Sequence, residues 1–160
     1  MPRIELTPMT QPEYEEWAVS SVSDYAKEKK RAQLLTDEEA QRVALESFAR
    51  LLPLGLQTEN QFIFSIFEAS FTTRIGSLWF GVLGSISDRK AFLYDIFLTP
   101  EFQNRGYGKE AMALLEIEVR KRGLKSIGLH VFGHNTRALT LYLNLGYGVT
   151  DVNLTKVLSE

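Results

Sequence analysis

A short glycine-containing segment joins a strand-like run to an amphipathic helix. The run from 91 to 98 is rich in aromatic and β-branched residues and stops at Thr99-Pro100, as a strand does where the chain must turn. From Tyr107 onward, apolar residues recur at helical spacing until Gly123. The segment from Gln103 to Lys109 is therefore predicted to connect a strand to the start of a helix, which favours an α/β arrangement for this half of the chain.

The start of that helix is predicted to bind an anion. Its first backbone N–H groups have no partner within the helix, and the helix dipole leaves partial positive charge there. Arg105 and Lys109 supply further positive charge, and Gly106 and Gly108 let the backbone approach a ligand closely. We therefore expect a phosphate group at this position.

Two common phosphate loops do not fit this segment. A Walker loop has four residues between its first glycine and Gly-Lys-Ser/Thr, whereas Gly106 and Gly108 are one residue apart and Glu110 follows Lys109. A dinucleotide loop has its glycines directly after the strand and an acid about 20 residues later. Here residues 99–105 intervene, and residues 126–135 contain no acid.

Two motifs in this half of the chain match one known family. They are Gln103, Gly106 and Gly108 in a Gln/Arg-x-x-Gly-x-Gly/Ala pattern, and Asn135, Ala138 and Tyr142 in an Asn-x-x-Ala-x-x-x-Tyr pattern. Gly146-Tyr147 then matches the Gly-aromatic pair that opens the family's last strand. In order and spacing, residues 91–158 resemble the Gcn5-related N-acetyltransferase (GNAT) superfamily, in its small, single-domain bacterial form.

The order of expected elements agrees with this resemblance. We expect a strand at 3–7, helices at 11–35 and 36–52, strands near 61–69 and 74–83 with residues 71–73 between them, and then the strand at 91–98, the helix from 107, a strand at 126–132, a second helix and a last strand. The resemblance implies one α/β domain over residues 1–160, with a mixed, mostly antiparallel central sheet that is splayed at the cofactor site and flanked by helices on both faces. Residues 1–60 would form the acceptor side, and residues 91–158 would bind acetyl-CoA.

Composition excludes several other classes. With 18 basic and 20 acidic residues, the chain has no overall attraction to nucleic acid or to an anionic membrane. Cysteine is absent and the two histidines are separated, so we expect no disulfide, no cysteine nucleophile and no metal site. The first residues carry an acid early and no long apolar core, which favours a cytoplasmic protein. The sequence does not decide whether the protein forms a homodimer.

The resemblance implies roles for particular residues. Acetyl-CoA would lie along the backbone of Ile96, Phe97 and Leu98, with the Leu98 N–H donating to the thioester oxygen as that oxygen gains negative charge. Its pyrophosphate would bind Gln103, Asn104, Arg105, Gly106, Tyr107, Gly108 and Lys109. Asn135, Ala138 and Tyr142 would also contact the cofactor. Tyr142 would be the general acid. Asn135 is also a good N-cap for the second helix, and the two roles compete.

The general base is left open by the sequence. Strand alternation predicts Tyr94, Ile96 and Leu98 on one face, with Leu93, Asp95 and Phe97 on the other. Asp95 is the only carboxylate in this strand and could hold the acceptor's ammonium or relay its proton, or it could be a solvated or hydrogen-bonded structural residue. Glu68 and His134 are weaker candidates.

The expected reaction is direct transfer of an acetyl group from acetyl-CoA to a primary amine in a ternary complex. Such an amine has a pKa of roughly 10.4 in water, so a base must remove its proton. A non-catalytic acyl-CoA sensor is the alternative. A nucleic-acid-binding module, suggested only by the basic patch at residues 120–122, is less favoured because the overall charge is not basic.

Overall fold

Five strands form one sheet in the order in which they occur along the chain. The structure is a computed structural model that describes residues 2–70 and 72–160. Its strands are β1 (Ile4–Pro8), β2 (Gln61–Glu68), β3 (Arg74–Leu83), β4 (Lys90–Leu98) and β5 (Ile127–Leu129). The pairs β1–β2, β2–β3 and β3–β4 are antiparallel, and β5 is parallel to β4. The predicted mixed, mostly antiparallel sheet is thus confirmed. Phe71, predicted to lie between two strands, is outside the described residues.

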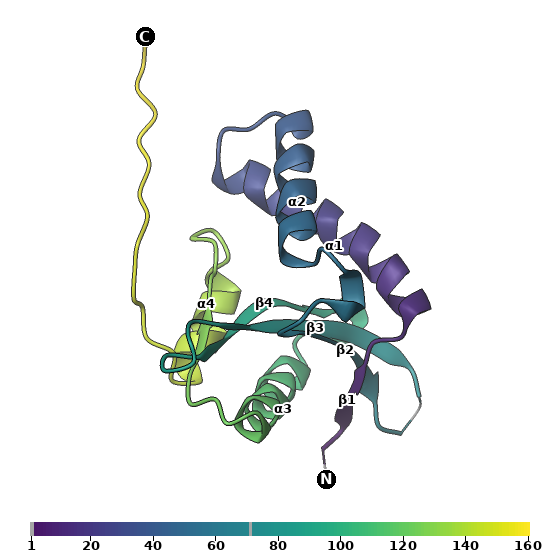
Figure 1. Ribbon diagram of the computed structural model, residues 1–160. Coiled ribbons are helices and arrows are strands. Elements are labelled where there is room, and N and C mark those ends of the chain that lie inside the picture. The colour runs from purple at the N-terminus through teal and green to yellow at the C-terminus, as the bar shows by residue number, and fades with distance from the viewer. Residues whose placement is uncertain (1, 71) are drawn as a thin grey trace.

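Helices cover both faces of the sheet, as predicted. Helices α1 (Gln11–Ala32) and α2 (Asp37–Leu51) lie on one face, and α3 (Tyr107–Lys121) lies on the other (Figure 1). Helix α4 (Thr136–Asn144) packs near the β5 end of the sheet. Two short 3-10 turns, η1 (Gly55–Gln57) and η2 (Pro100–Phe102), complete the regular structure.

Capping residues explain where the first two helices begin. Thr36 caps α2 through a capping box with Glu39, as predicted from the sequence. Thr10 and Glu13 form the same arrangement at the start of α1. Helix α1 ends at Ala32, a few residues before the predicted end at Leu35.

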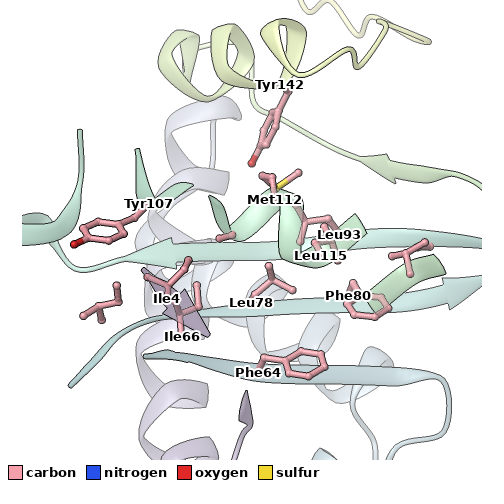
Figure 2. Packing of buried hydrophobic residues seen from close by; sticks show 14 of the residues in the cluster. Ile4, Phe64, Ile66, Leu78, Phe80, Leu93, Tyr107, Met112, Leu115 and Tyr142 are labelled. Atoms are coloured by element: carbon pink, nitrogen blue, oxygen red, sulfur yellow. The ribbon is translucent and has the colours of Figure 1, made fainter. Parts of the chain in front are cut away.

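The sheet separates two apolar layers. The layer against α3 and α4 includes Ile4, Phe64, Ile66, Leu78, Phe80, Leu93, Met112, Leu115 and Tyr142 (Figure 2). The layer against α1 and α2 is built on Met9, Trp17, Leu52, Ile63 and Trp79. Burial of apolar surface on both faces holds α1 and α3 against opposite sides of the same strands.

A β-bulge in β4 makes one sequence prediction wrong. Trp79 of β3 lies opposite Asp95, but Phe80 lies opposite Leu93, so Tyr94 is the extra residue. The bulge shifts the alternation: Ile96 joins Leu93 on the α3 side, while Tyr94 stacks on Trp79 at 4.6 Å on the α1 side. Tyr94 and Ile96 therefore lie on opposite faces of the sheet, whereas simple alternation had predicted that they share one face.

The predicted last strand does not form. Gly146, with φ of 96°, follows the end of α4, and residues 148–160 contain no helix or strand. An isolated extended segment has no backbone hydrogen bonds of its own, so it needs a neighbouring strand. Strand β5 is also shorter than the predicted span of 126–132, because it diverges from β4 after Leu129.

Candidate active site

Strands β4 and β5 diverge and leave part of β4 without a strand on one side. The two strands pair only over Ala91–Leu93 and Ile127–Leu129, whereas β4 continues beside β3 until Leu98 lies opposite Gly76. In the described chain, the β5 side of β4 beyond Leu93 therefore has no strand partner. We call this opening the β4/β5 split.

The backbone N–H and C=O groups of successive residues near the end of β4 point alternately toward the split and toward β3. The N–H of Thr99 donates to the Ile75 carbonyl at 2.9 Å, so Thr99 faces β3. Phe97 faces the same way, since a Cβ placed on Gly76 would lie 2.0 Å from the Phe97 carbonyl oxygen. Alternation then turns the backbone groups of Ile96 and Leu98 toward the split. Of the three backbone positions predicted for the cofactor, only these two face it.

Gln103 fixes the end of the split. Its Nε2 donates to the Leu98 carbonyl oxygen at 2.8 Å in a partly buried hydrogen bond. The Leu98 carbonyl is therefore satisfied by protein, while the Leu98 N–H on the same edge of the strand stays directed at the split. Gln103 thus acts on the predicted site by holding the loop against β4.

The start of α3 has the geometry of an anion site. Gly106 is the N-cap with φ of 82°, and no side chain caps the helix. Asn104 also has positive φ, 63°. Left-handed residues next to right-handed ones turn successive backbone N–H groups toward one side. The first N–H groups of α3 therefore have no side-chain acceptor and can bind an anion.

The side chains at the N-terminus of α3 differ in their exposure to solvent. Arg105 and Lys109 are exposed. A Cβ on Gly108 would lie 3.7 Å from Leu141 and 3.9 Å from Leu98, which are ordinary contact distances. Tyr107, in contrast, is buried and donates a hydrogen bond from its hydroxyl to Glu68 Oε1 at 3.0 Å. This hydrogen bond anchors α3 to β2, and the Glu68 carboxylate is one of its two partners.

Asn135 caps α4. Its Oδ1 accepts a hydrogen bond from the Ala138 N–H at 3.2 Å, which confirms the predicted capping role. Ala138 is partly buried against the α3 layer. A cofactor contact by Asn135 or Ala138 stays a prediction.

Tyr142 extends from α4 into the layer beside α3, with its hydroxyl end directed toward Met112 and the sheet (Figure 2). Burial raises the pKa of its phenol, and the charge of Asp95 raises that pKa further. Tyr142 therefore holds its proton at neutral pH. A phenol that keeps its proton can donate it to an anion that leaves beside it.

Asp95 lies on the opposite side of β4, against α1. Ser21 Oγ donates to Asp95 Oδ2 at 3.3 Å. Burial raises the pKa of Asp95 to about 6, Asp24 adds to this effect, and hydrogen bonds from Ser21 and Trp17 oppose it. A carboxylate with this pKa is ionised at neutral pH and can accept a proton.

One contact beside the site was not predicted from the sequence. His134 Nε2, in the loop before α4, pairs with Glu28 Oε2 of α1. The His134 ring also stacks on Phe132 at 5.6 Å. The pair joins α1 to the loop that follows β5. Because 106 residues separate the partners, no local spacing could have linked them.

Two negative observations limit the kinds of site. No group of three or more residues that could hold a metal ion occurs among residues 2–70 and 72–160. In the same part of the chain, no helix combines the length and apolar character needed to cross a membrane.

Known proteins share this architecture. The family model for the acetyltransferase (GNAT) family matches residues 32–147. N-acetyltransferase YycN of Bacillus subtilis is 34% identical over 155 residues, which cover 97% of this chain and 99% of YycN. A crystal structure of YycN superposes with a TM-score of 0.92, covering 98% of this chain and 99% of YycN.

A more distant structural neighbour carries a ligand. Aminoglycoside N-acetyltransferase AAC(6')-Iy, solved in complex with CoA, superposes with a TM-score of 0.60 at 18% identity, covering 96% of this chain and 93% of that chain. At this identity the likeness shows the fold alone. The family match and the YycN similarity over nearly the whole chain show that this chain belongs to the GNAT family of acetyltransferases.

Proposed function

We propose that this chain is an acyl-CoA-dependent N-acetyltransferase that moves an acetyl group from acetyl-CoA to a primary amine by direct attack in a ternary complex. The observation that carries the proposal is the β4/β5 split beside an uncapped α3 N-terminus. This combination offers backbone amides of β4 without a strand partner close to helix N–H groups without a side-chain cap. A pantetheine arm joined to a pyrophosphate requires both.

The residues present fit acetyl-CoA. Its pyrophosphate would accept hydrogen bonds from the first N–H groups of α3, with Arg105 and Lys109 adding positive charge. The amides of the pantetheine arm would pair with Ile96 and Leu98, whose backbone groups lack a strand partner. Asn104, Gly106 and Gly108 would keep the loop open to the phosphates. Gln103 and Tyr107 would support this loop from behind.

The two halves of the chain would divide the work. Residues 91–158 would hold acetyl-CoA, and residues 1–60 would form the acceptor side. Helix α1 supports this division, since it brings Ser21 and Asp24 to Asp95. An amine acceptor would then approach Asp95 from the α1 side of β4.

Three groups would perform the chemistry that acetyl-CoA makes available as a thioester. Asp95, ionised at neutral pH, would draw the cationic amine and take its proton directly or through water. The Leu98 N–H would stabilise negative charge on the carbonyl oxygen. Tyr142, which keeps its proton at neutral pH, would protonate the departing thiolate.

A non-catalytic acyl-CoA sensor would use the same binding elements. It would not need a proton-bearing phenol on α4 and a carboxylate with a raised pKa on the other side of β4. Their joint presence favours the enzyme over the sensor.

Acceptor profiling tests the proposal. The purified chain is incubated with acetyl-CoA and a panel of polyamines, amino acids, aminoglycosides and peptides with free N-termini, and CoA thiol release is followed together with product mass. We expect thiol release matched by an acetylated amine for at least one class. CoA binding without transfer to any amine would favour the sensor.

A further inference from the structure

Arg3, which immediately precedes β1, ties the sheet to the first turn of α3. The Ala69 N–H, just after β2, donates to the Arg3 carbonyl oxygen at 2.8 Å, so the sheet fixes the backbone of Arg3. The Arg3 N–H donates to Glu110 Oε1 at 2.8 Å, and Arg3 Nε donates to Glu110 Oε2 at 2.8 Å. The guanidinium also lies 4.3 Å from the centre of the Tyr107 ring. Arg3 therefore holds the start of α3 through both its backbone and its side chain.

The same guanidinium holds the loop before α3. Arg3 Nη2 donates to the Arg105 carbonyl oxygen at 3.0 Å, and a Cβ placed on Gly106 would lie 3.2 Å from Nη2. A trans peptide unit is planar, and its C=O and N–H point in opposite directions. Because Arg3 holds the Arg105 carbonyl, the N–H of the same peptide unit, which belongs to Gly106, points away from Arg3. Within residues 2–70 and 72–160, this N–H has no acceptor.

The charge of Glu110 would oppose an anion at this place if it were not balanced. Glu110 is the fourth residue of α3, and helix side chains lean toward the N-terminal end of their helix. A free carboxylate there would repel a phosphate and would itself be attracted to the unpaired N–H groups. Arg3 gives both carboxylate oxygens a partner on the β1 side and balances their charge.

We propose that Arg3 is a positioning residue for the pyrophosphate of acetyl-CoA: it turns the Gly106 N–H toward the ligand and keeps the Glu110 carboxylate away from it. This inference rests on the proposed function, since it requires a pyrophosphate at the start of α3. The Arg3 side chain is 51% exposed, and an exposed ion pair adds little to stability. The effect of this network is therefore expected on CoA affinity rather than on folding.

Two other roles for Arg3 predict different results. If Arg3 bound the phosphates directly, removing the Glu110 charge would free its guanidinium and raise CoA affinity most in the wild-type background. If Arg3 only supported the fold, its loss would lower the free energy of unfolding, and removing the Glu110 charge would not restore CoA affinity. Positioning predicts that removal of the Glu110 charge matters mainly when Arg3 is absent.

Calorimetry with CoA separates these roles. It is applied to the wild type, Arg3→Met, Glu110→Gln and the double variant, with Arg120→Met as the matched control because Arg120 pairs with Glu116 nearer the other end of α3. We expect a roughly tenfold higher dissociation constant in Arg3→Met, as for loss of charge-assisted hydrogen bonds. We expect little change in Glu110→Gln and Arg120→Met, and partial recovery in the double variant. Wild-type affinity in Arg3→Met, or a double variant that binds no better than Arg3→Met, would overturn the proposal.

Unfolding by urea checks that each variant is folded. Arg3→Lys, which keeps the charge but not the planar fork, takes the place of Arg3→Met if the latter does not fold. It should also bind CoA more weakly than the wild type, and unchanged affinity would count equally against the proposal.

The Gly106 amide provides a direct readout of its orientation. We expect saturating CoA to slow hydrogen exchange at this amide in the wild type, and to slow it less in Arg3→Met at equal saturation. A purely structural role would not change this one amide at equal saturation. A wild-type protein that binds no CoA would remove the proposed function together with this inference. CoA binding that leaves the Gly106 amide unprotected in the wild type would overturn this inference alone.

Discussion

The phenol of Tyr142 on α4 lies within electrostatic reach of the Asp95 carboxylate on β4. Burial raises the pKa of the phenol, and the charge of Asp95 raises it further. Burial also raises the pKa of Asp95, to about 6. At neutral pH the pair therefore consists of a protonated acid and an ionised base, which suits a reaction that removes a proton from one group and delivers one to another.

Tyr142→Phe tests the acid. Removing the hydroxyl should lower kcat by about 10²-fold, the usual effect of losing a positioned general acid. Because the ring stays in the apolar layer, the affinity for CoA, measured by calorimetry, should change little. Turnover equal to the wild type, under conditions where chemistry limits the rate, would leave Tyr142 with a packing role only.

Gly108→Val tests the anion site at the start of α3. A Cβ at this position would meet Leu141 and Leu98 only at ordinary distances, so the protein should fold, but the added bulk would lie where the phosphates approach the backbone. We expect a sharply higher dissociation constant for CoA by calorimetry. Gly148→Val, where a Cβ would meet nothing within 4 Å, is the matched control. Unchanged CoA affinity in Gly108→Val would remove the phosphate assignment.

Asp95→Asn tests the base through the pH–rate profile. With a pKa of about 6, the wild-type carboxylate loses its proton as the pH rises through this value, so kcat/KM should rise over the same range. The asparagine side chain keeps the shape of the aspartate and can accept the hydrogen bond from Ser21, but it cannot ionise. We expect a lower kcat/KM for the best amine and loss of this rise, with nearly unchanged CoA affinity. An unaltered profile would make Asp95 structural.

The same substitution makes a prediction about stability. The pKa of Asp95 is raised on folding from an ordinary value of 3.8 to about 6, so between these values the folded state binds more protons than the unfolded state. The contribution of Asp95 to stability therefore falls as the pH rises from about 4 to about 6. The Asp95→Asn variant has no carboxyl group at this position and does not lose stability in this way. Its free energy of unfolding by urea, relative to the wild type, should increase over this range and level off above it; a difference independent of pH would contradict the raised pKa.

The sequence alone predicted most of the elements between residues 91 and 144. Local patterns were sufficient there: the stop at Thr99-Pro100, the glycines of the loop, and the apolar stripe that ends near Gly123 each depend on neighbouring residues. The capping box of α2 was likewise predicted from the sequence, because its partners Thr36 and Glu39 are three residues apart.

Features that depend on distant residues could not be predicted in this way. The bulge at Tyr94 arises from the register of β4 on β3, and it places Asp95 opposite Trp79. The Glu28–His134 pair joins residues from opposite ends of the chain. The last strand was predicted from a Gly-aromatic motif, but a strand also needs a partner, and the described chain provides none for residues 148–160.

We propose that acetyl-CoA lies in the β4/β5 split and at the start of α3. Amide hydrogen exchange followed by NMR, with and without acetyl-CoA, tests this claim residue by residue. We expect slower exchange at Ile96 and Leu98 and at the first amides of α3, with little change at Phe97, whose backbone already faces β3. Saturating acetyl-CoA that leaves the Ile96 and Leu98 amides unprotected, or that protects a different surface, would contradict the account.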